Sequence, residues 1–279
     1  MPGDACATDD LSMNRFVSLS YGAISYLLFL VVFVYAILFV GDLMVPRTVD
    51  NAISAPVGQA VVVDLVLLTA FALQHSVMAR PAFKRWWTRF VPQPVERSTY
   101  VLFASLVLAL VLWQWRSIPA VVWEVTSTPA RVAIWALFWL GWVIVLASTF
   151  MISHFELFGL RQVYAAWRSR PQAETGFRTT LFYRVVRHPL NLGFIVAFWS
   201  APTMTVGHLL FAAATTGWIM IAMQLEERDL SASLGSRYAA YREAVPILIP
   251  GLRKRRRPQP NPDAQRSVTA LPDAEINVT

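Results

Sequence analysis

The hydrophobic pattern of this chain consists of long apolar runs separated by short polar segments. Four of the runs are each near the roughly 20 residues that a helix needs to cross a bilayer, and they lie at residues 18–41, 60–78, 99–115 and 131–152. The first run is long and has little positive charge before it, so we expect it to stay in the mature protein and not act as a cleaved signal peptide. The pattern therefore predicts four membrane-spanning helices.

A further apolar stretch, residues 189–224, is broken in the middle. The break is Ala201-Pro202-Thr203-Met204-Thr205-Val206-Gly207, and proline and glycine are residues that stop or bend a helix. We therefore predict a helical hairpin at this position. The predicted fold class is an all-α integral membrane protein with about six membrane crossings, the C-terminal hairpin included.

Basic residues fall on one side of this arrangement. Twenty of the 24 Lys and Arg residues lie in residues 79–98, in residues 153–188 and after Leu225, whereas the loops 42–59 and 116–130 carry one each. Because Lys and Arg are retained on the cytoplasmic side, both termini are expected to face the cytoplasm. The net charge of +7 then requires no nucleic-acid partner, since basic loops also attract anionic lipid.

Composition supports the membrane class and narrows the chemistry. Hydrophobic residues make up 56% of the chain and charged residues 15%, against about 25% charged in an average soluble domain. With one cysteine, Cys6, and four widely separated histidines, neither an intramolecular disulfide nor a catalytic metal is expected. No dinucleotide-binding or P-loop motif is present.

The same pattern divides the chain into four parts. The parts are a cytoplasmic N-terminal segment (1–17), a four-span bundle (18–152), a cytoplasmic loop with the hairpin and a C-terminal segment (153–252), and the basic tail (253–279). The tail begins with a basic run, and we expect it to contact lipid headgroups and otherwise to be disordered.

Polar groups gather near the predicted cytoplasmic ends of the spans. Gln74-His75-Ser76 and Arg80 end the second span, and His75 alone is more often a polar group packed between helices than a catalyst. Glu96-Arg97-Ser98 precedes the third span and is typical of an ordinary helix start, with Ser98 as the N-cap.

A third group, His154 to Gln162, follows the fourth span. His154 and Glu156 would not share a helix face, but Gly159 indicates that the helix ends and lets the two converge. Histidine is the side chain best suited to proton transfer near neutral pH. A pocket-lining role and a structural role both stay open for this group.

The fourth group flanks the hairpin. Arg187-His188-Pro189 opens it and Glu226-Glu227 closes it. A helix N-terminus beside cations suits an anion, and adjacent carboxylates accept hydrogen bonds from an amine or from ribose hydroxyls. We expect a zwitterionic or nucleoside-bearing ligand here, and the alternative is a cluster of snorkelling charges at the membrane edge.

These residues resemble the C-terminal signature of the isoprenylcysteine carboxyl methyltransferase superfamily. The resemblance implies a membrane enzyme that binds S-adenosylmethionine between the last hairpin and a cytoplasmic C-terminal segment. Asn191 stands where the superfamily commonly has tyrosine, and it can hydrogen-bond but cannot stack. The implied cofactor-binding residues are Arg187, His188, Pro189, Asn191, Gly193, Glu226, Glu227, Tyr238, Tyr241 and Arg242.

The N-terminal half is similar to the bacterial membrane methanethiol S-methyltransferases and their NnrU-type relatives. The similar segments are Gln74-His75-Ser76 with Arg80, Glu96-Arg97-Ser98, residues 154–162 and residues 201–208. This resemblance implies methyl transfer from S-adenosylmethionine to methanethiol, giving dimethyl sulfide at a bacterial inner membrane. It implies catalytic roles for His154, Glu156 and, as the second candidate base, His75, with Arg80 and Arg161 at the substrate.

Other interpretations remain open on the sequence alone. The same architecture could methylate a lipid, a prenylated thiol or a larger acceptor. A non-enzymatic NnrU-like protein is a second alternative, and a reductase with a nicotinamide cofactor is a weaker third. The leading hypothesis has a small volatile thiol and membrane lipid as partners and no nucleic acid.

Overall fold

The computed structural model describes residues 14–170 and 181–251, which form a helical protein with two small strand pairs. The basic tail and most of the N-terminal segment lie outside the described residues. The helices are α1 (Arg15–Val40), α2 (Val57–Ala79), α3 (Pro81–Trp87), α4 (Gln93–Gln114), α5 (Thr128–Ile152), α6 (His154–Leu157), α7 (Leu160–Trp167), the 3-10 helix η1 (Leu181–Arg184), α8 (Pro189–Trp199), α9 (Val206–Leu234) and α10 (Ser236–Ala244).

Five helices of the described chain, α1, α2, α4, α5 and α9, are long and apolar enough to cross a membrane. The four predicted spans are confirmed, but their helices begin before the apolar runs. Pro94 occupies the first turn of α4, where a missing backbone N–H has no cost. The prediction that Ser98 caps this helix is therefore wrong, because Ser98 is buried inside α4, which begins at Gln93.

The predicted break in the last apolar stretch is confirmed, and the two arms of the hairpin are unequal. Helix α8 has 11 residues and α9 has 29. At 1.5 Å per residue α8 is about 16 Å long, roughly half the thickness of the hydrocarbon core of a bilayer. The hairpin thus pairs one full span with one short helix.

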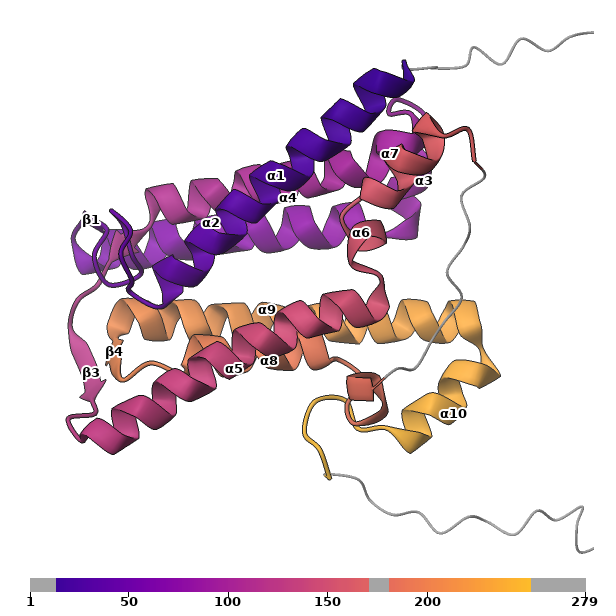
Figure 1. Cartoon of the computed structure of the whole chain (residues 1–279). Coiled ribbons are helices and arrows are strands. Elements are labelled where there is room, and N and C mark those ends of the chain that lie inside the picture. Colours follow the sequence, from indigo (N-terminus) through magenta and orange to yellow (C-terminus); the bar gives the residue numbers. More distant parts are fainter. Residues whose placement is uncertain (1–13, 171–180, 252–279) are drawn as a thin grey trace, which may run out of the picture.

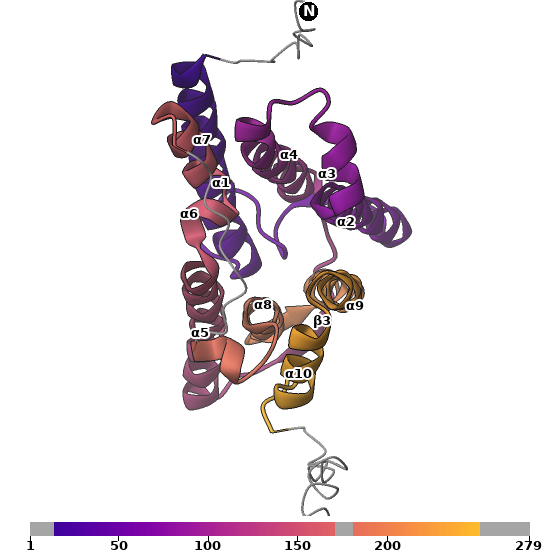
Figure 2. The same cartoon turned by 90° about the vertical axis from the view of Figure 1, so that its right-hand side faces the viewer.

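The helices form two layers (Figure 1). One layer holds α1, α2 and α4, and the other holds α5, α8 and α9, with α8 between α5 and α9 (Figure 2). Aromatic side chains join the layers, since Phe33 of α1 meets Trp142 of α5 edge to face and Phe39 meets Phe211 of α9. The short helices α3, α6, α7 and α10 all lie toward the same end of the molecule.

Helices α5 and α8 pack closely against each other at two glycines. A Cβ atom added at Gly193 would lie 2.7 Å from the carbonyl oxygen of Gly141, and one added at Gly141 would lie 2.7 Å from the carbonyl oxygen of Gly193. Any larger residue would force the backbones apart, so these glycines fix the position of α8. Small residues at a helix interface are the usual means of close approach in membranes.

Short strands and buried polar groups lie at the end of the molecule opposite the short helices (Figure 1). β1 (Ile53–Ser54) pairs in parallel with β2 (Arg116–Ser117), and β3 (Val121–Glu124) pairs antiparallel with β4 (Thr203–Thr205). The Oδ1 atom of Asp50 accepts a 2.5 Å hydrogen bond from Thr205, and its Oδ2 atom lies 3.8 Å from Nδ1 of His208. These contacts join loops that are more than 60 residues apart in sequence.

Candidate functional site

Glu227 is the centre of a buried cluster on α9. Its carboxylate accepts hydrogen bonds from Nε2 of His188 at 2.9 Å and from the hydroxyl of Tyr238 at 2.6 Å. Arg187 forms an ion pair with its other oxygen, and Nε of Arg242 lies 3.4 Å from that oxygen. Because Glu227 is only 8% exposed, we infer that its carboxylate organises the surrounding cations.

The neighbouring carboxylate of Glu226 is more accessible. Its side chain is 54% exposed, and its Oε2 atom lies 3.6 Å from Nδ1 of His188. His188 therefore sits between two carboxylates, with one ring nitrogen facing each. Glu226 can contact a bound molecule while Glu227 holds the site together.

Backbone pairing assembles this cluster from three parts of the chain. His188 is the N-cap of α8 and Pro189 occupies the first turn, which confirms the helix start predicted from the sequence. The backbone N–H groups of Arg187 and His188 donate to the carbonyls of Pro246 and Ile247 at 2.9 and 3.2 Å. The segment after α10 is thus fixed beside the segment before α8.

Two tyrosines of α10 stay protonated in this setting. Burial, together with the hydrogen bond to Glu227, raises the pKa of Tyr238 above its ordinary value. Burial also raises the pKa of Tyr241 to about 12, and its hydroxyl donates a 2.6 Å hydrogen bond to the carbonyl of Tyr183. Both phenols are therefore hydrogen-bond donors at neutral pH.

The predicted cofactor residues divide into two groups. Arg187, His188, Glu226, Glu227, Tyr238 and Arg242 come together in the cluster, and Tyr241 joins it through the loop before α8. Gly193 instead packs against α5 at Gly141. Asn191 lies two residues before Gly193, in the first turn of α8.

His154 lies apart from this cluster, and both of its ring nitrogens are occupied. Nε2 lies 2.7 Å from the hydroxyl of Tyr26, and Nδ1 lies 2.9 Å from Oγ1 of Thr149. Thr149 donates its own proton to the carbonyl of Leu146, so it accepts from His154 Nδ1–H and Tyr26 donates to Nε2. Burial lowers the pKa of His154, which agrees with a neutral ring.

The remaining predicted polar residues form separate pairs. The Nδ1 atom of His75 lies 3.0 Å from the hydroxyl of Tyr100. Arg80 forms a 2.6 Å ion pair with Asp229 of α9, which joins the two layers close to the cluster. Arg161 pairs with Glu156 at 2.9 Å.

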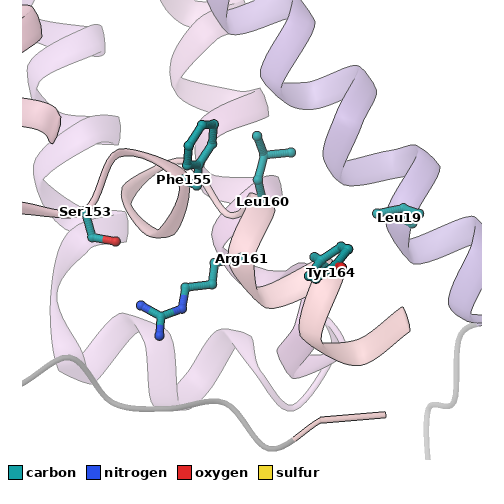
Figure 3. Close-up of a pocket in the computed structure, with 6 residues that line it drawn as sticks. All are labelled: Leu19, Ser153, Phe155, Leu160, Arg161 and Tyr164. Carbon is teal, nitrogen blue, oxygen red and sulfur yellow. The ribbon is translucent and has the colours of Figure 1, made fainter. Parts of the chain in front are cut away.

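Arg161 also lines a cavity of about 420 Å³ between α1 and the α6–α7 segment. Leu19, Phe155 and Leu160 supply its apolar walls, and Ser153 and Tyr164 complete it (Figure 3). The left-handed Gly159, with a φ of 85°, lets α7 turn away from α6. The predicted helix end at this glycine is confirmed. The residues that line the cavity do not belong to the Glu227 cluster.

Several partners in these groups escaped the sequence analysis. Tyr26 and His154 are 128 residues apart, and Arg80 and Asp229 are 149 residues apart. No local spacing indicates such pairs, because they depend on how the helices pack. The contact between Tyr100 and Arg97 could have been suspected from the sequence, since residues three apart lie on one face of a helix.

Comparison with known proteins places the chain among membrane methyltransferases. It is 66% identical over 238 residues to methanethiol S-methyltransferase of Mycobacterium tuberculosis, a match that covers 85% of this chain and 98% of that protein. It is 52% identical over 243 residues to methanethiol S-methyltransferase 2 of Bradyrhizobium diazoefficiens, covering 87% and 93% of the two chains.

A more distant relative is nurim of Rattus norvegicus, 30% identical over 175 residues, which covers 60% of this chain and 66% of that one. No family model and no solved structure matches the chain. The high identity to the bacterial proteins extends over nearly their whole length. The chain therefore belongs to the methanethiol S-methyltransferase family.

Proposed function

We propose that this protein is a membrane S-adenosylmethionine-dependent methyltransferase that converts methanethiol to dimethyl sulfide. The observation that carries the proposal is the 66% identity over 98% of the length of the Mycobacterium tuberculosis enzyme. At this similarity the fold and the polar side chains of the site are expected to be shared. Methanethiol is small and apolar, so it can approach through the bilayer.

The residues of the Glu227 cluster fit the chemistry of the proposed cofactor. The Nε atom of Arg187 is buried without a hydrogen-bond partner among the described residues, and it suits a carboxylate. The exposed carboxylate of Glu226 suits an ammonium group or ribose hydroxyls. We propose that Arg187 and Arg242 hold the carboxylate end, with His188, Pro189, Asn191 and Tyr241 nearby.

When bound, S-adenosylmethionine supplies a methyl group on a positively charged sulfur. The protein's own residues hold this group and exclude water, since the site lies between apolar helices. Removing water from a thiolate beside a sulfonium favours transfer, because the charges neutralise each other. Glu227 acts through the residues that it orients, and Tyr238 keeps its carboxylate in place.

The acceptor thiol also has to lose its proton. A thiol with a cysteine-like pKa near 8.5 is mostly protonated at neutral pH, so a base or a positive environment is required. The Nε2 lone pair of His154 already accepts from Tyr26. The Tyr100 hydroxyl contacts His75 in a similar way, but His154 is buried and His75 is exposed. We therefore propose His154 and Glu156 as positioning residues of the α6–α7 segment, and the more accessible His75 as the better candidate base.

We also propose that the protein lies in the bacterial inner membrane with both termini in the cytoplasm. The distribution of Lys and Arg supports this orientation. The basic segments around α3, α7 and α10 lie at one end of the structure, and the strand pairs lie at the other (Figure 1).

Headspace detection of dimethyl sulfide tests the proposed reaction. Membranes that contain the protein are supplied with methanethiol and methyl-labelled S-adenosylmethionine, and membranes without it are the control. Labelled dimethyl sulfide above the control is the expected result. Folded protein that binds the cofactor without forming this product would contradict the proposed acceptor, and folded protein that does not bind it would contradict the enzyme class.

A further inference from the structure

A second polar group lies on α2 and α4, outside the Glu227 cluster. The Tyr100 hydroxyl lies 3.0 Å from Nδ1 of His75, and the Arg97 guanidinium carbon lies 5.1 Å from the centre of the Tyr100 ring. Tyr100 is buried, whereas the His75 side chain is exposed. A small molecule can therefore reach the histidine ring beside a fixed phenol and a cation.

Among the described residues Arg97 has no acidic partner, unlike Arg80 and Arg187. Its Nε atom donates a 2.9 Å hydrogen bond to the neutral carbonyl of Leu157, and within residues 14–170 and 181–251 its guanidinium forms no ion pair. A half-buried cation at the end of a membrane span is costly without a partner. The remaining guanidinium N–H groups are available to an anion.

A second cation strengthens the positive potential at this position. Burial, and after it the nearby Arg97 charge, lowers the pKa of Lys84 on α3. Such repulsion between cations indicates that positive charge is concentrated here. The carboxylate of Glu96 acts on Lys84 in the opposite direction, but it forms no ion pair with Arg97.

Apolar side chains surround the polar group. Tyr100 packs in a cluster with Met78 and Val101, and partly buried aromatic residues cover this cluster. Phe158 of the α6–α7 segment is among them and stacks on Phe29 of α1 at 4.1 Å. These surroundings suit a small apolar molecule that carries one negative charge.

The polar group is connected to the proposed cofactor site. Arg80 ends the helix that carries His75, and its ion pair with Asp229 reaches α9 two residues beyond Glu227. The Arg80 guanidinium thus joins the two polar groups across the contact between α2 and α9.

We propose that Arg97, Tyr100 and His75 form the subsite that binds the sulfur of the acceptor as a thiolate, an inference that rests on the proposed function. The thiol proton passes to a ring nitrogen of His75 and then to water. The thiolate sulfur forms a new bond to the methyl carbon, and the electrons of the broken carbon–sulfur bond stay on the donor sulfur, which becomes a neutral thioether.

Steady-state kinetics of Arg97→Gln tests the subsite, with Arg89→Gln as the matched control. Arg89 is exposed at the same end of the molecule, and its change also removes one positive charge. We expect Arg97→Gln to raise the KM for methanethiol about tenfold or more and to shift the acidic limb of kcat upward by about one pH unit, because the bound thiol loses a neighbouring cation. The dissociation constant of S-adenosylmethionine is expected to stay within about twofold.

Two further variants keep the test decisive if Arg97→Gln does not fold. Arg97→Lys retains the charge and is expected to restore the pH profile, and Tyr100→Phe removes only the hydroxyl and is expected to raise the KM about threefold. If these variants and Arg97→Gln match Arg89→Gln in KM and pH profile, the subsite is overturned. If the wild-type protein itself forms no dimethyl sulfide, the proposed function fails before any variant is compared.

Discussion

At the residue scale, Glu227 shows how one buried carboxylate organises several cations. It accepts from His188 and Tyr238 and pairs with Arg187. Taking a charge out of water is costly unless such partners compensate it. Removing the carboxylate would in turn leave the buried Arg187 guanidinium without its counter-charge.

We therefore predict that Glu227→Gln lowers the affinity for S-adenosylmethionine about tenfold or more, because breaking a buried ion pair costs about 3–5 kcal/mol and part of that cost appears as disorder of the site. Equilibrium binding to the purified protein in detergent measures the change. Glu243→Gln, an exposed position on α10, is the control. Equal affinities for the two variants would contradict the organising role of Glu227.

The lowered pKa of His154 leads us to predict that the stability of the protein depends on pH. Burial lowers its pKa in the folded protein, so between the folded value and the ordinary value of about 6.5 the unfolded chain binds more protons. The contribution of His154 to stability is therefore complete above about pH 6.5 and is lost as the pH falls through that value toward the folded pKa.

Thermal unfolding in detergent between pH 7.5 and 5 measures this effect. The wild-type protein is expected to lose stability over this range more steeply than His154→Asn, which cannot titrate. Parallel slopes for the two proteins would show that His154 does not carry the pH dependence.

Sequence reasoning identified the part of the site whose residues adjoin the hairpin. Arg187, His188 and Glu227 could be predicted to meet, because the two arms of a hairpin bring its ends together. The hydrogen bond between Tyr26 and His154 could not be predicted, since it depends on the packing of α1 against a segment 128 residues later. The same reason explains why Asp229 was missed.

At the element scale, apolar length predicted the spans better than their ends. The run at 99–115 corresponds to α4, Gln93–Gln114, because polar residues and proline extend the helix beyond the hydrocarbon region. The apolar pattern also gave no reason for α8 to be so short. The helix ends at Trp199, and the chain then becomes extended so that β4 can pair with β3.

The contact between α5 and α8 leads to a prediction about Gly193. A Cβ atom there would lie 2.7 Å from a backbone oxygen, so Gly193→Ala is expected to destabilise the protein by about 1–3 kcal/mol through overpacking. Gly217→Ala on α9 is the matched control, because a Cβ atom at that position meets nothing within 4 Å. Thermal unfolding of both variants compares them.

Loss of stability in Gly193→Ala alone is the expected result. Equal stability of the two variants would mean that α5 and α8 can separate at no cost. Because α8 carries His188 at its N-cap, the destabilised variant is also expected to bind the cofactor more weakly.

At the scale of the whole molecule, the two ends differ in charge and in construction. The short helices α3, α6, α7 and α10, with the basic segments around them, lie at one end, and the strand pairs lie at the other (Figure 1). The proposed orientation places Arg89 in the cytoplasm and Val122 of β3 on the opposite side. Both side chains are exposed.

Cysteine labelling tests this orientation in a Cys6→Ser background. A membrane-impermeant maleimide is expected to label Val122→Cys in intact cells and Arg89→Cys only after the cells are permeabilised, because the reagent cannot cross the bilayer. The reverse pattern would show that the basic end faces outward.

The shortness of α8 has a consequence for what happens after the reaction. Because this helix is about 16 Å long, roughly half the thickness of the hydrocarbon core, we expect the residues at its N-cap to be within reach of both lipid and water. For the proposed reaction, the two products would leave into different phases. Dimethyl sulfide would dissolve in the surrounding lipid, the charged nucleoside thioether would return to water, and their separation would oppose the reverse reaction.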